Sequence, residues 1–477
     1  MKEQKIENNV FLKSAAWIAA GGFIAKIIGA VYRIPLTNLI GGHGLGLYQI
    51  VYPVYCLLLT VSATGIPSSI AKLTAERLGK GQSDAPVFQT ALKLFLWIGA
   101  VGTVLMCVLA PLLSAAQGAK EVAGGYYTLA PSVFLVSAIS VFRGWFQGRN
   151  NMKPTAVSEI TEQAVKVGFG LLFAYLYRGN VQKAVVFLLL SVTISEAVAL
   201  LVMFLMYKRV PAPHKIKNDG GRVAMKTVLK LSIPVTFSSM LLPLSGLLDS
   251  VLVPRLLGGY ATDAVALYGL FSGGAVTIIN LPVSICYGIA AASVPAVASA
   301  VGKITAVSAR KQTENNRTED KATEGNFTFP TAVRVVRKKI LFALGVTMLL
   351  GAVSAVGLYC FAEPTAKIIF RSLKGEELQI LTRLIRIFSV SAFTLSCVQT
   401  LSACLTAQGK PQYAALSMLI AVTVKTLTYL PLLRRETVSI FGLAYATNLC
   451  YLVAFLFDFL YNLIVSKRLC VKKEKNK

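Results

Sequence analysis

The strongest constraint in this sequence is a series of long apolar runs separated by short polar segments. Most runs are at least about 20 residues long, which is the length an α-helix needs to cross a bilayer. Of the 477 residues, 55% are hydrophobic and only 14% are charged, whereas soluble domains are about 25% charged. We therefore predict an all-α integral membrane protein with about twelve transmembrane helices. The runs lie near residues 14–36, 46–75, 88–114, 124–147, 156–178, 184–207, 229–255, 267–300, 335–361, 379–407, 412–433 and 438–465.

The net charge of +27 is explained by where the basic residues lie. More than half of the 48 Lys and Arg residues fall in the segments that share a side with both termini, and the opposite loops hold few. Cytoplasmic loops of membrane proteins carry such an excess. We therefore place both termini in the cytoplasm and expect attraction to anionic membrane lipids, not binding of nucleic acid.

Sequence motifs of enzymes and metal sites are missing. The eight cysteines form no Cys-x-x-Cys pair, only two histidines are present, and no Gly-x-x-x-x-Gly-Lys-Ser/Thr motif occurs. A P-loop, a zinc site and a serine triad all need such residues. We predict a protein that is not an enzyme, with no metal and no cofactor, and coupling to Na⁺ or H⁺ stays open.

Residues 24–80 contain two apolar runs joined by a Gly-rich turn, with Lys26 and Arg33 inside the first run. Charges and helix breakers are tolerated at membrane depth where they face protein or a water-filled cavity. The stretch therefore predicts a bent, polar-lined pair of helices. The breaks in helical regularity come from Pro35, Pro53 and Pro67.

Weak internal repeats indicate two halves. The segment after Gly41 resembles the segment after Gly259, and Gln147-Gly148 recurs as Gln408-Gly409. Repeats in the same orientation are typical of transporters whose two bundles rock around a central site. We predict two pseudo-symmetric six-helix bundles, residues 1–215 and 216–477, with a central cavity between them. A flexible cytoplasmic loop, residues 303–334, would join the eighth and ninth helices.

Three stretches carry a family resemblance: VYRIPLTNLIGGHGLGLYQIVYPVY, GIPSSIAKLTAE and FQGRNNMKPTAVSEITEQAVKV. They resemble the polysaccharide transporter branch of the multidrug/oligosaccharidyl-lipid/polysaccharide (MATE-like) exporter superfamily. The resemblance implies a flippase in the bacterial cell membrane that moves an undecaprenyl-diphosphate-linked saccharide outward by alternating access. The saccharide would serve polysaccharide or cell-wall synthesis, with the spore cortex among the open choices. The expected partners are the lipid-linked saccharide and membrane lipids, and we expect the protein to be a monomer.

Two other functions stay open at this point. A cation-coupled multidrug exporter would need an acidic cavity for organic cations, which the central Lys and Arg residues disfavour. A membrane scaffold for cell-wall enzymes would need its loops and not its intramembrane charges.

Four basic residues are candidates for binding the diphosphate, because Lys and Arg in a low-dielectric cavity are the natural partners of phosphate. Lys26 and Arg33 lie on one stripe of the first helix. Lys166 and Lys425 lie deep in the fifth and eleventh runs. The alternative is an internal salt bridge, and Glu162 precedes Lys166 by one helical turn.

Neutral and acidic residues complete the predicted site. Gln49, Tyr52 and Asn280 could bind sugar hydroxyls, although hydrogen bonds between helices explain them equally well. Asp249 and Glu196 are candidates for a counter-ion or coupling site, with Asp249 facing Arg33 across the two halves.

Overall fold

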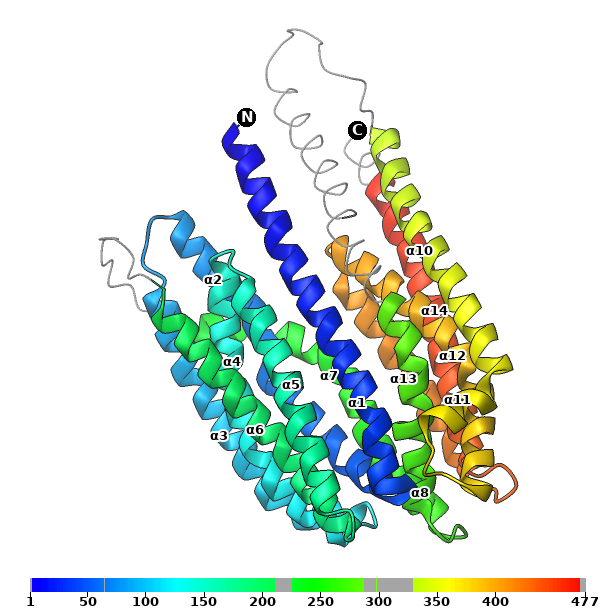
Figure 1. Ribbon diagram of the computed structural model, residues 1–477. Helices are drawn as coiled ribbons and strands as arrows, with labels where there is room; N and C mark the ends of the chain where they lie inside the picture. The colour runs from blue at the N-terminus through cyan, green and yellow to red at the C-terminus, as the bar shows by residue number, and fades with distance from the viewer. Residues whose placement is uncertain (1, 64, 211–224, 287–296, 298–328, 472–477) are drawn as a thin grey trace. The chain divides into compact units, whose positions relative to one another are not determined.

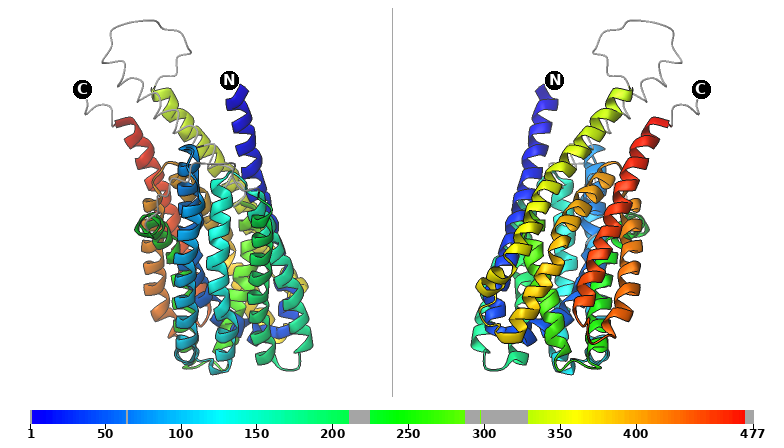
Figure 2. Two further views of the ribbon diagram at one scale, coloured as in Figure 1. Left: turned by 90° about the vertical axis from the view of Figure 1, so that its left-hand side faces the viewer. Right: turned by 90° about the vertical axis from the view of Figure 1, so that its right-hand side faces the viewer.

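The computed structural model describes residues 2–63, 65–210, 225–286, 297 and 329–471. These residues form helices and short connections, and no strand occurs among them (Figures 1 and 2). The all-α prediction is confirmed. The α-helices are α1 (Lys2–Ala63), α2 (Gly65–Gly79), α3 (Ala85–Ala116), α4 (Ala123–Gly148), α5 (Lys153–Leu176), α6 (Val181–Lys208), α7 (Met225–Leu257), α8 (Ala264–Gly269), α10 (Phe329–Cys360), α11 (Ala362–Ile369), α12 (Gly375–Ala407), α13 (Pro411–Leu433) and α14 (Phe441–Val471). A 3₁₀ turn, η1 (Lys120–Val122), precedes α4, and a π-helix, η2 (Leu270–Ala275), follows α8.

Ten helical segments in the described part of the chain are long and apolar enough to cross a membrane. They are compatible with the twelve predicted spans. The segment Ile27–Gly79 counts once, although it contains two helices that meet at Gly41. The helix α5 is missing from the ten and carries four charged residues, which it can hold in a bilayer only if they face protein or water.

The predicted Gly-rich turn is present inside α1. Gly41 has φ 69° and ψ −175°, a conformation that is open to glycine and strained for other residues. The chain therefore changes direction at Gly41 and continues as a second helix. Pro35 and Pro53 lie within the two helical parts, where each removes one backbone hydrogen bond.

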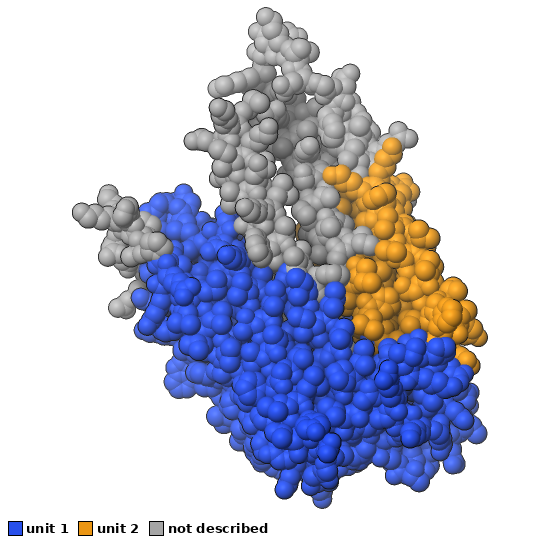
Figure 3. Space-filling view, in the orientation of Figure 1, with its two compact units in different colours: residues 1–277, 363–383, 432–440 blue, residues 278–362, 384–431, 441–477 orange. Residues whose placement is uncertain are grey.

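The described chain divides into two compact units (Figure 3). Unit 1 comprises residues 1–277, 363–383 and 432–440, and unit 2 comprises residues 278–362, 384–431 and 441–477. Unit 1 thus takes in α7 and α8 together with the first six helices. The predicted division of the chain at residues 215 and 216 stays a prediction.

The core of unit 1 surrounds α4, which is the most buried of the candidate spans in this unit. Its aromatic side chains Phe142, Trp145 and Phe146 pack with Phe88 of α3 and with apolar residues of α2, α6 and α7. Small residues allow the helices to approach closely, as they do in other membrane bundles. At Gly144, for example, a Cβ would lie 2.8 Å from the backbone of α2.

The second part of α1 meets α8 at a pair of glycines. A Cβ on Gly269 would lie 2.5 Å from the backbone nitrogen of Gly46. No side chain fits between the two helices at this point, so their backbones are in contact. The π-helix η2 continues this packing, since Gly273 lies against Leu45.

The segment 363–383 is attached to α1 within unit 1. The amide of Asn38 donates to the carbonyl of Ile369 at 3.0 Å and accepts from the backbone N–H of Ser372 at 3.0 Å. This segment contains the short helix α11, which the apolar pattern did not predict. The helix is stabilised by a pair one turn apart, in which Lys367 donates to Glu363 at 2.7 Å.

Unit 2 is built from α10, α13, α14 and most of α12. One apolar cluster joins α10 and α12 through Val336, Ile340 and Leu401, and a second joins α12, α13 and α14 through Ala421, Cys450 and Ala454. Most of the predicted loop 303–334 lies outside the described residues. Its last residues are helical because α10 begins at Phe329, and a proline directly after the start suits a first helical turn.

Candidate functional site

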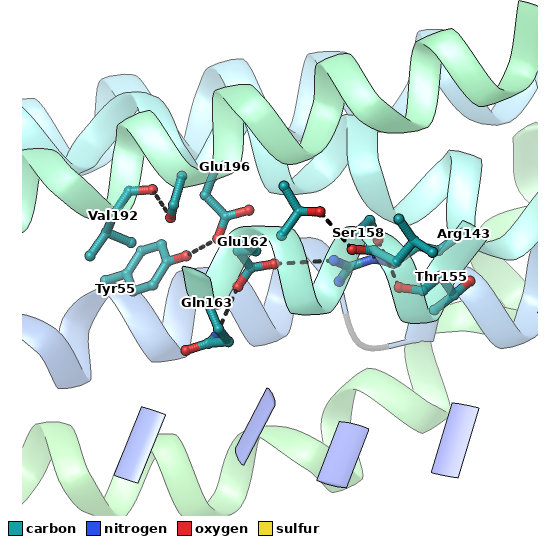
Figure 4. A network of polar contacts seen from close by, with 11 residues as sticks. Tyr55, Arg143, Thr155, Ser158, Glu162, Gln163, Val192 and Glu196 are labelled. Atoms are coloured by element: carbon teal, nitrogen blue, oxygen red, sulfur yellow. Dashed lines mark hydrogen bonds and ion pairs between the residues drawn. The ribbon is translucent and has the colours of Figure 1, made fainter. Parts of the chain in front are cut away.

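Polar side chains of α1, α4, α5 and α6 form two hydrogen-bonded groups inside unit 1 (Figure 4). Arg143 of α4 pairs with Glu162 of α5, with 3.1 Å between Nη2 and Oε2. It also donates to the hydroxyl of Ser158 at 3.1 Å, and Gln163 donates to Glu162 at 3.4 Å. The Arg143 and Glu162 side chains are 17% and 18% exposed, so the pair is largely withdrawn from solvent.

Glu196 of α6 lies beside this pair and is buried. The hydroxyl of Tyr55 in α1 donates to its carboxylate at 3.0 Å (Figure 4). Glu196 also interacts electrostatically with Arg143 and Lys166. Lys166 of α5 is attracted electrostatically by Glu162 and Glu196 and repelled by Arg33.

Arg33 differs from Arg143 and Lys166 because its hydrogen-bond partner is a neutral side chain. Its guanidinium donates to the hydroxyl of Thr277 at 2.6 Å, and Thr277 follows the π-helix η2 by two residues. Within the described residues Arg33 forms no ion pair with a carboxylate. Insertions of this π-helical kind are frequent at functional sites, and here one lies just before the residue that holds Arg33.

Aromatic and thiol groups of the second part of α1 lie near the same cations. Tyr52 stacks on Tyr48, with 5.1 Å between ring centroids, and hydrogen-bonds to Cys56. Arg33 interacts electrostatically with Tyr48, Tyr52 and Cys56, and Lys166 with Cys56. The predicted residues Arg33, Lys166 and Tyr52 are therefore brought together, with Glu196 next to them.

Three further predicted residues lie on helices of unit 1. Gln49 and Asp249 are buried, on α1 and α7. The pairing of Asp249 with Arg33 stays a prediction, as do the sugar contact of Gln49 and the coupling role of Asp249. Lys26 lies in α1, but its side chain is outside what the structure describes.

Two predicted residues belong to unit 2. Lys425 is buried on α13, and Asn280 is exposed on the helical continuation of η2, where its backbone carbonyl accepts from Ser284 at 2.7 Å. The structure describes each within its own unit, so their role in the site stays a prediction.

Sequence reasoning missed Arg143 and Thr277. Arg143 could have been found, because a charged residue inside an apolar run is a functional candidate by default. Thr277 gives no such signal, since its importance comes from a contact between segments 244 residues apart.

Comparison with known proteins identifies the family of the chain. The model of the polysaccharide biosynthesis protein family matches residues 11–301. Stage V sporulation protein B of Bacillus subtilis (strain 168) is 26% identical over 450 residues, which cover 91% of this chain and 80% of that protein. Lipid II flippase MurJ of the same organism is 20% identical over 474 residues, covering 94% of this chain and 82% of that protein.

Solved structures share the fold. An inward-facing multidrug resistance MATE family transporter of the MOP superfamily superposes with a TM-score of 0.76 at 16% identity, covering 94% of this chain and 96% of its own. A MOP superfamily transporter from Pyrococcus furiosus, described as having a binding pocket of reverse polarity, superposes with a TM-score of 0.64 at 16% identity and covers 96% of each chain. The chain is thus a multi-pass membrane protein with a MATE-like fold, and it belongs to the polysaccharide biosynthesis protein family, the polysaccharide transporter branch of the MOP superfamily.

Proposed function

We propose that this membrane transporter is a flippase for a lipid-linked saccharide whose carrier is undecaprenyl diphosphate. It moves the substrate from the inner to the outer leaflet of the bacterial cell membrane by alternating access, with both termini in the cytoplasm, and it works as a monomer. Relatives named for sporulation and for lipid II flipping support a cell-wall or spore-cortex saccharide over a soluble solute.

The observation that carries the proposal is the state of Arg33. It lies in an intramembrane helix, its hydrogen-bond partner is the neutral hydroxyl of Thr277, and a second cation, Lys166, repels it. Arg143 and Lys166 have Glu162 or Glu196 to offset their charge. A cation without an offset is costly at membrane depth, and a diphosphate supplies the missing negative charge through charge-assisted hydrogen bonds.

The neighbouring side chains suit the rest of such a substrate. Tyr52 and Tyr48 present stacked rings and hydroxyls close to Arg33, a combination that can contact both sugar faces and sugar hydroxyls. An inside-negative membrane potential favours outward movement of an anion by about 2.3 kcal/mol per charge per 100 mV. We therefore propose that the potential drives net transport without a nucleotide.

The test is a reconstituted flipping assay with defined undecaprenyl-diphosphate-linked sugars in proteoliposomes. Loss of one charge-assisted hydrogen bond is worth about 1.5–3 kcal/mol, so Arg33→Gln should weaken apparent substrate affinity about 10- to 100-fold. Arg33→Lys should retain part of it. The matched control is Arg255→Gln, an exposed residue in the last turn of α7, which should transport normally.

Two results would refute the proposal. One is normal flipping by Arg33→Gln in membranes where the protein is folded and inserted. The other is transport of organic cations that is insensitive to Arg33, which would favour the cation-coupled multidrug exporter.

A further inference from the structure

Unit 2 contains a carboxylate whose environment differs from that of every carboxylate in the site above. Asp458 lies in the membrane-spanning part of α14 and is 0% exposed. The hydroxyl of Ser402 in α12 donates to its Oδ2 at 2.5 Å. The hydroxyl of Ser417 in α13 contacts its Oδ1. Three spanning helices therefore meet at this one acidic group.

No cation offsets a negative charge at this position. Within the described residues Asp458 forms no ion pair, and no basic side chain contributes to its electrostatic environment. One turn earlier on α14, Ala454 belongs to an apolar cluster of α12, α13 and α14. An isolated ionised carboxylate is strongly disfavoured in such surroundings, and the usual outcome is that the group becomes neutral.

The hydrogen bonds around Asp458 fit a neutral carboxylic acid. The hydroxyl of Ser417 has a second acceptor, the carbonyl of Ala414 at 2.9 Å. When Ser417 donates to Ala414, its oxygen is free to accept a hydrogen bond from a protonated Oδ1 of Asp458. Ser402 then donates to Oδ2, and every polar atom of the acid has a partner.

We propose that Asp458 is an exchangeable proton-binding site of this transporter. The proton resides on Oδ1, held by Ser417, and its departure leaves a charge that α12, α13 and α14 do not offset. A proton suits this geometry better than a metal ion, because both hydroxyl oxygens touch the carboxylate directly. A sodium ion would have to sit between oxygens that are already in hydrogen-bond contact.

A polar path leads from Asp458 toward one end of the three helices. Ser402 lies 5 residues from the end of α12 at Ala407, and Ser417 lies 6 residues from the start of α13 at Pro411, which is about 8–9 Å along the axes. Two polar side chains follow in this direction. The amide of Asn462 donates to the backbone carbonyl of Asp458 at 2.8 Å, and Gln408 donates to Asn462 at 2.8 Å.

The far end of this path reaches the surface. Asn462 also lines a shallow depression together with the exposed Arg337 of α10. The Oε1 of Gln408 is buried and has no hydrogen-bond partner among the described residues, so it can accept one from a proton-carrying group. Polar side chains therefore lie between Asp458 and this depression, which makes this end of the three helices the expected side of proton exchange.

The charged groups of the surrounding helices lie elsewhere. On α13, Lys425 is 8 residues beyond Ser417, and the charged residues of α10 are Arg334, Arg337, Lys338 and Lys339. On α12 the charged residues lie in its first turns, from Glu376 to Arg386. None of the described charged side chains pairs with Asp458.

The experiment is infrared difference spectroscopy of the purified full-length protein in detergent at neutral pH, without substrate. Wild type minus Asp458→Asn should show the carbonyl band of a protonated carboxylic acid, and this band should shift in deuterium oxide because the proton exchanges. The matched control is Asp84→Asn. Asp84 accepts two hydrogen bonds from Arg149, at 2.7 and 2.9 Å, so its difference spectrum should show only an ionised carboxylate.

Ser417→Ala keeps the acid and removes its acceptor, so it should shift the band, and it serves if Asp458→Asn does not fold. Absence of the band at neutral pH in both comparisons would overturn the proposal. A band that does not shift in deuterium oxide would show that the proton on Asp458 does not exchange, and would overturn that part of the proposal. A band that sodium chloride removes and choline chloride does not would identify a sodium site instead of a proton site. The readout needs no transport, so it stands or fails separately from the flippase proposal.

Discussion

Replacing Glu162 with Gln removes the carboxylate that pairs with Arg143 at 3.1 Å. Less than a fifth of each side chain is exposed, so solvent screens the stranded guanidinium poorly. Removing one partner of a buried pair costs about 3–5 kcal/mol. Because Arg143 keeps its bond to Ser158 and a second interaction with Glu159, we expect about 2–3 kcal/mol of lost unfolding free energy.

The double variant Arg143→Met/Glu162→Gln removes the stranded charge as well. It should be within about 1 kcal/mol of wild type, which gives a coupling energy of about 2 kcal/mol or more. The assay is equilibrium unfolding in mixed micelles of a mild detergent and dodecyl sulfate, followed by far-ultraviolet circular dichroism.

The exposed pair of Lys72 and Glu76 provides the control for this cycle. Its atoms are 3.9 Å apart and its side chains are 60% and 50% exposed, so Glu76→Gln should cost less than about 0.5 kcal/mol. The reasoning fails if Glu162→Gln is no more destabilising than Glu76→Gln. It also fails if the double variant loses the sum of the two single losses.

Three further predictions concern the ends of helices in unit 1. Gly41→Ala should cost about 1–3 kcal/mol because of its positive φ, whereas Gly168→Ala, in open space on α5, should be neutral or slightly stabilising in the same unfolding assay. Asn38→Leu removes two hydrogen bonds to the end of α11 and the turn that follows it, so amide hydrogen exchange there should rise while exchange in α4 is unchanged. Arg149→Lys should cost about 1–2 kcal/mol of unfolding free energy although the charge is kept. Only the guanidinium can bond both oxygens of Asp84 and stack 3.9 Å from the ring centre of Trp145. A loss no larger than that of an exposed Arg→Lys change would contradict this.

The helical architecture was predictable because apolar runs of membrane length have few other interpretations. The turn at Gly41 was predictable for a similar reason, since a cluster of glycines between two such runs leaves little choice of conformation. The helix α11 was missed because its apolar side is too short to stand out from a polar loop. Its only local signal is the spacing of Glu363 and Lys367, which also occurs by chance.

The site was predictable only in part. The rule that intramembrane charges are functional identified Arg33 and Lys166, which the structure places near one another. Their partners could not be derived from the sequence, because Thr277 and Arg143 come from distant helices. The spacing of one helical turn suggested an ion pair between Glu162 and Lys166. In the structure the direct ion pair of Glu162 is with Arg143 of α4. The guanidinium of Arg143 bonds this carboxylate and the hydroxyl of Ser158 at the same time.

The contact between Gly46 and Gly269 has a mechanical consequence. The two helices touch backbone to backbone, and no side chain lies between them that could change rotamer. A displacement of one helix at this point therefore displaces the other. Any swing of the second part of α1 must carry α8 and the π-helix after it, and so must carry Thr277. The distance between the Arg33 guanidinium and the Thr277 hydroxyl would then change with the movement. Binding of an anion at Arg33 and the tilt of α1 would therefore be coupled.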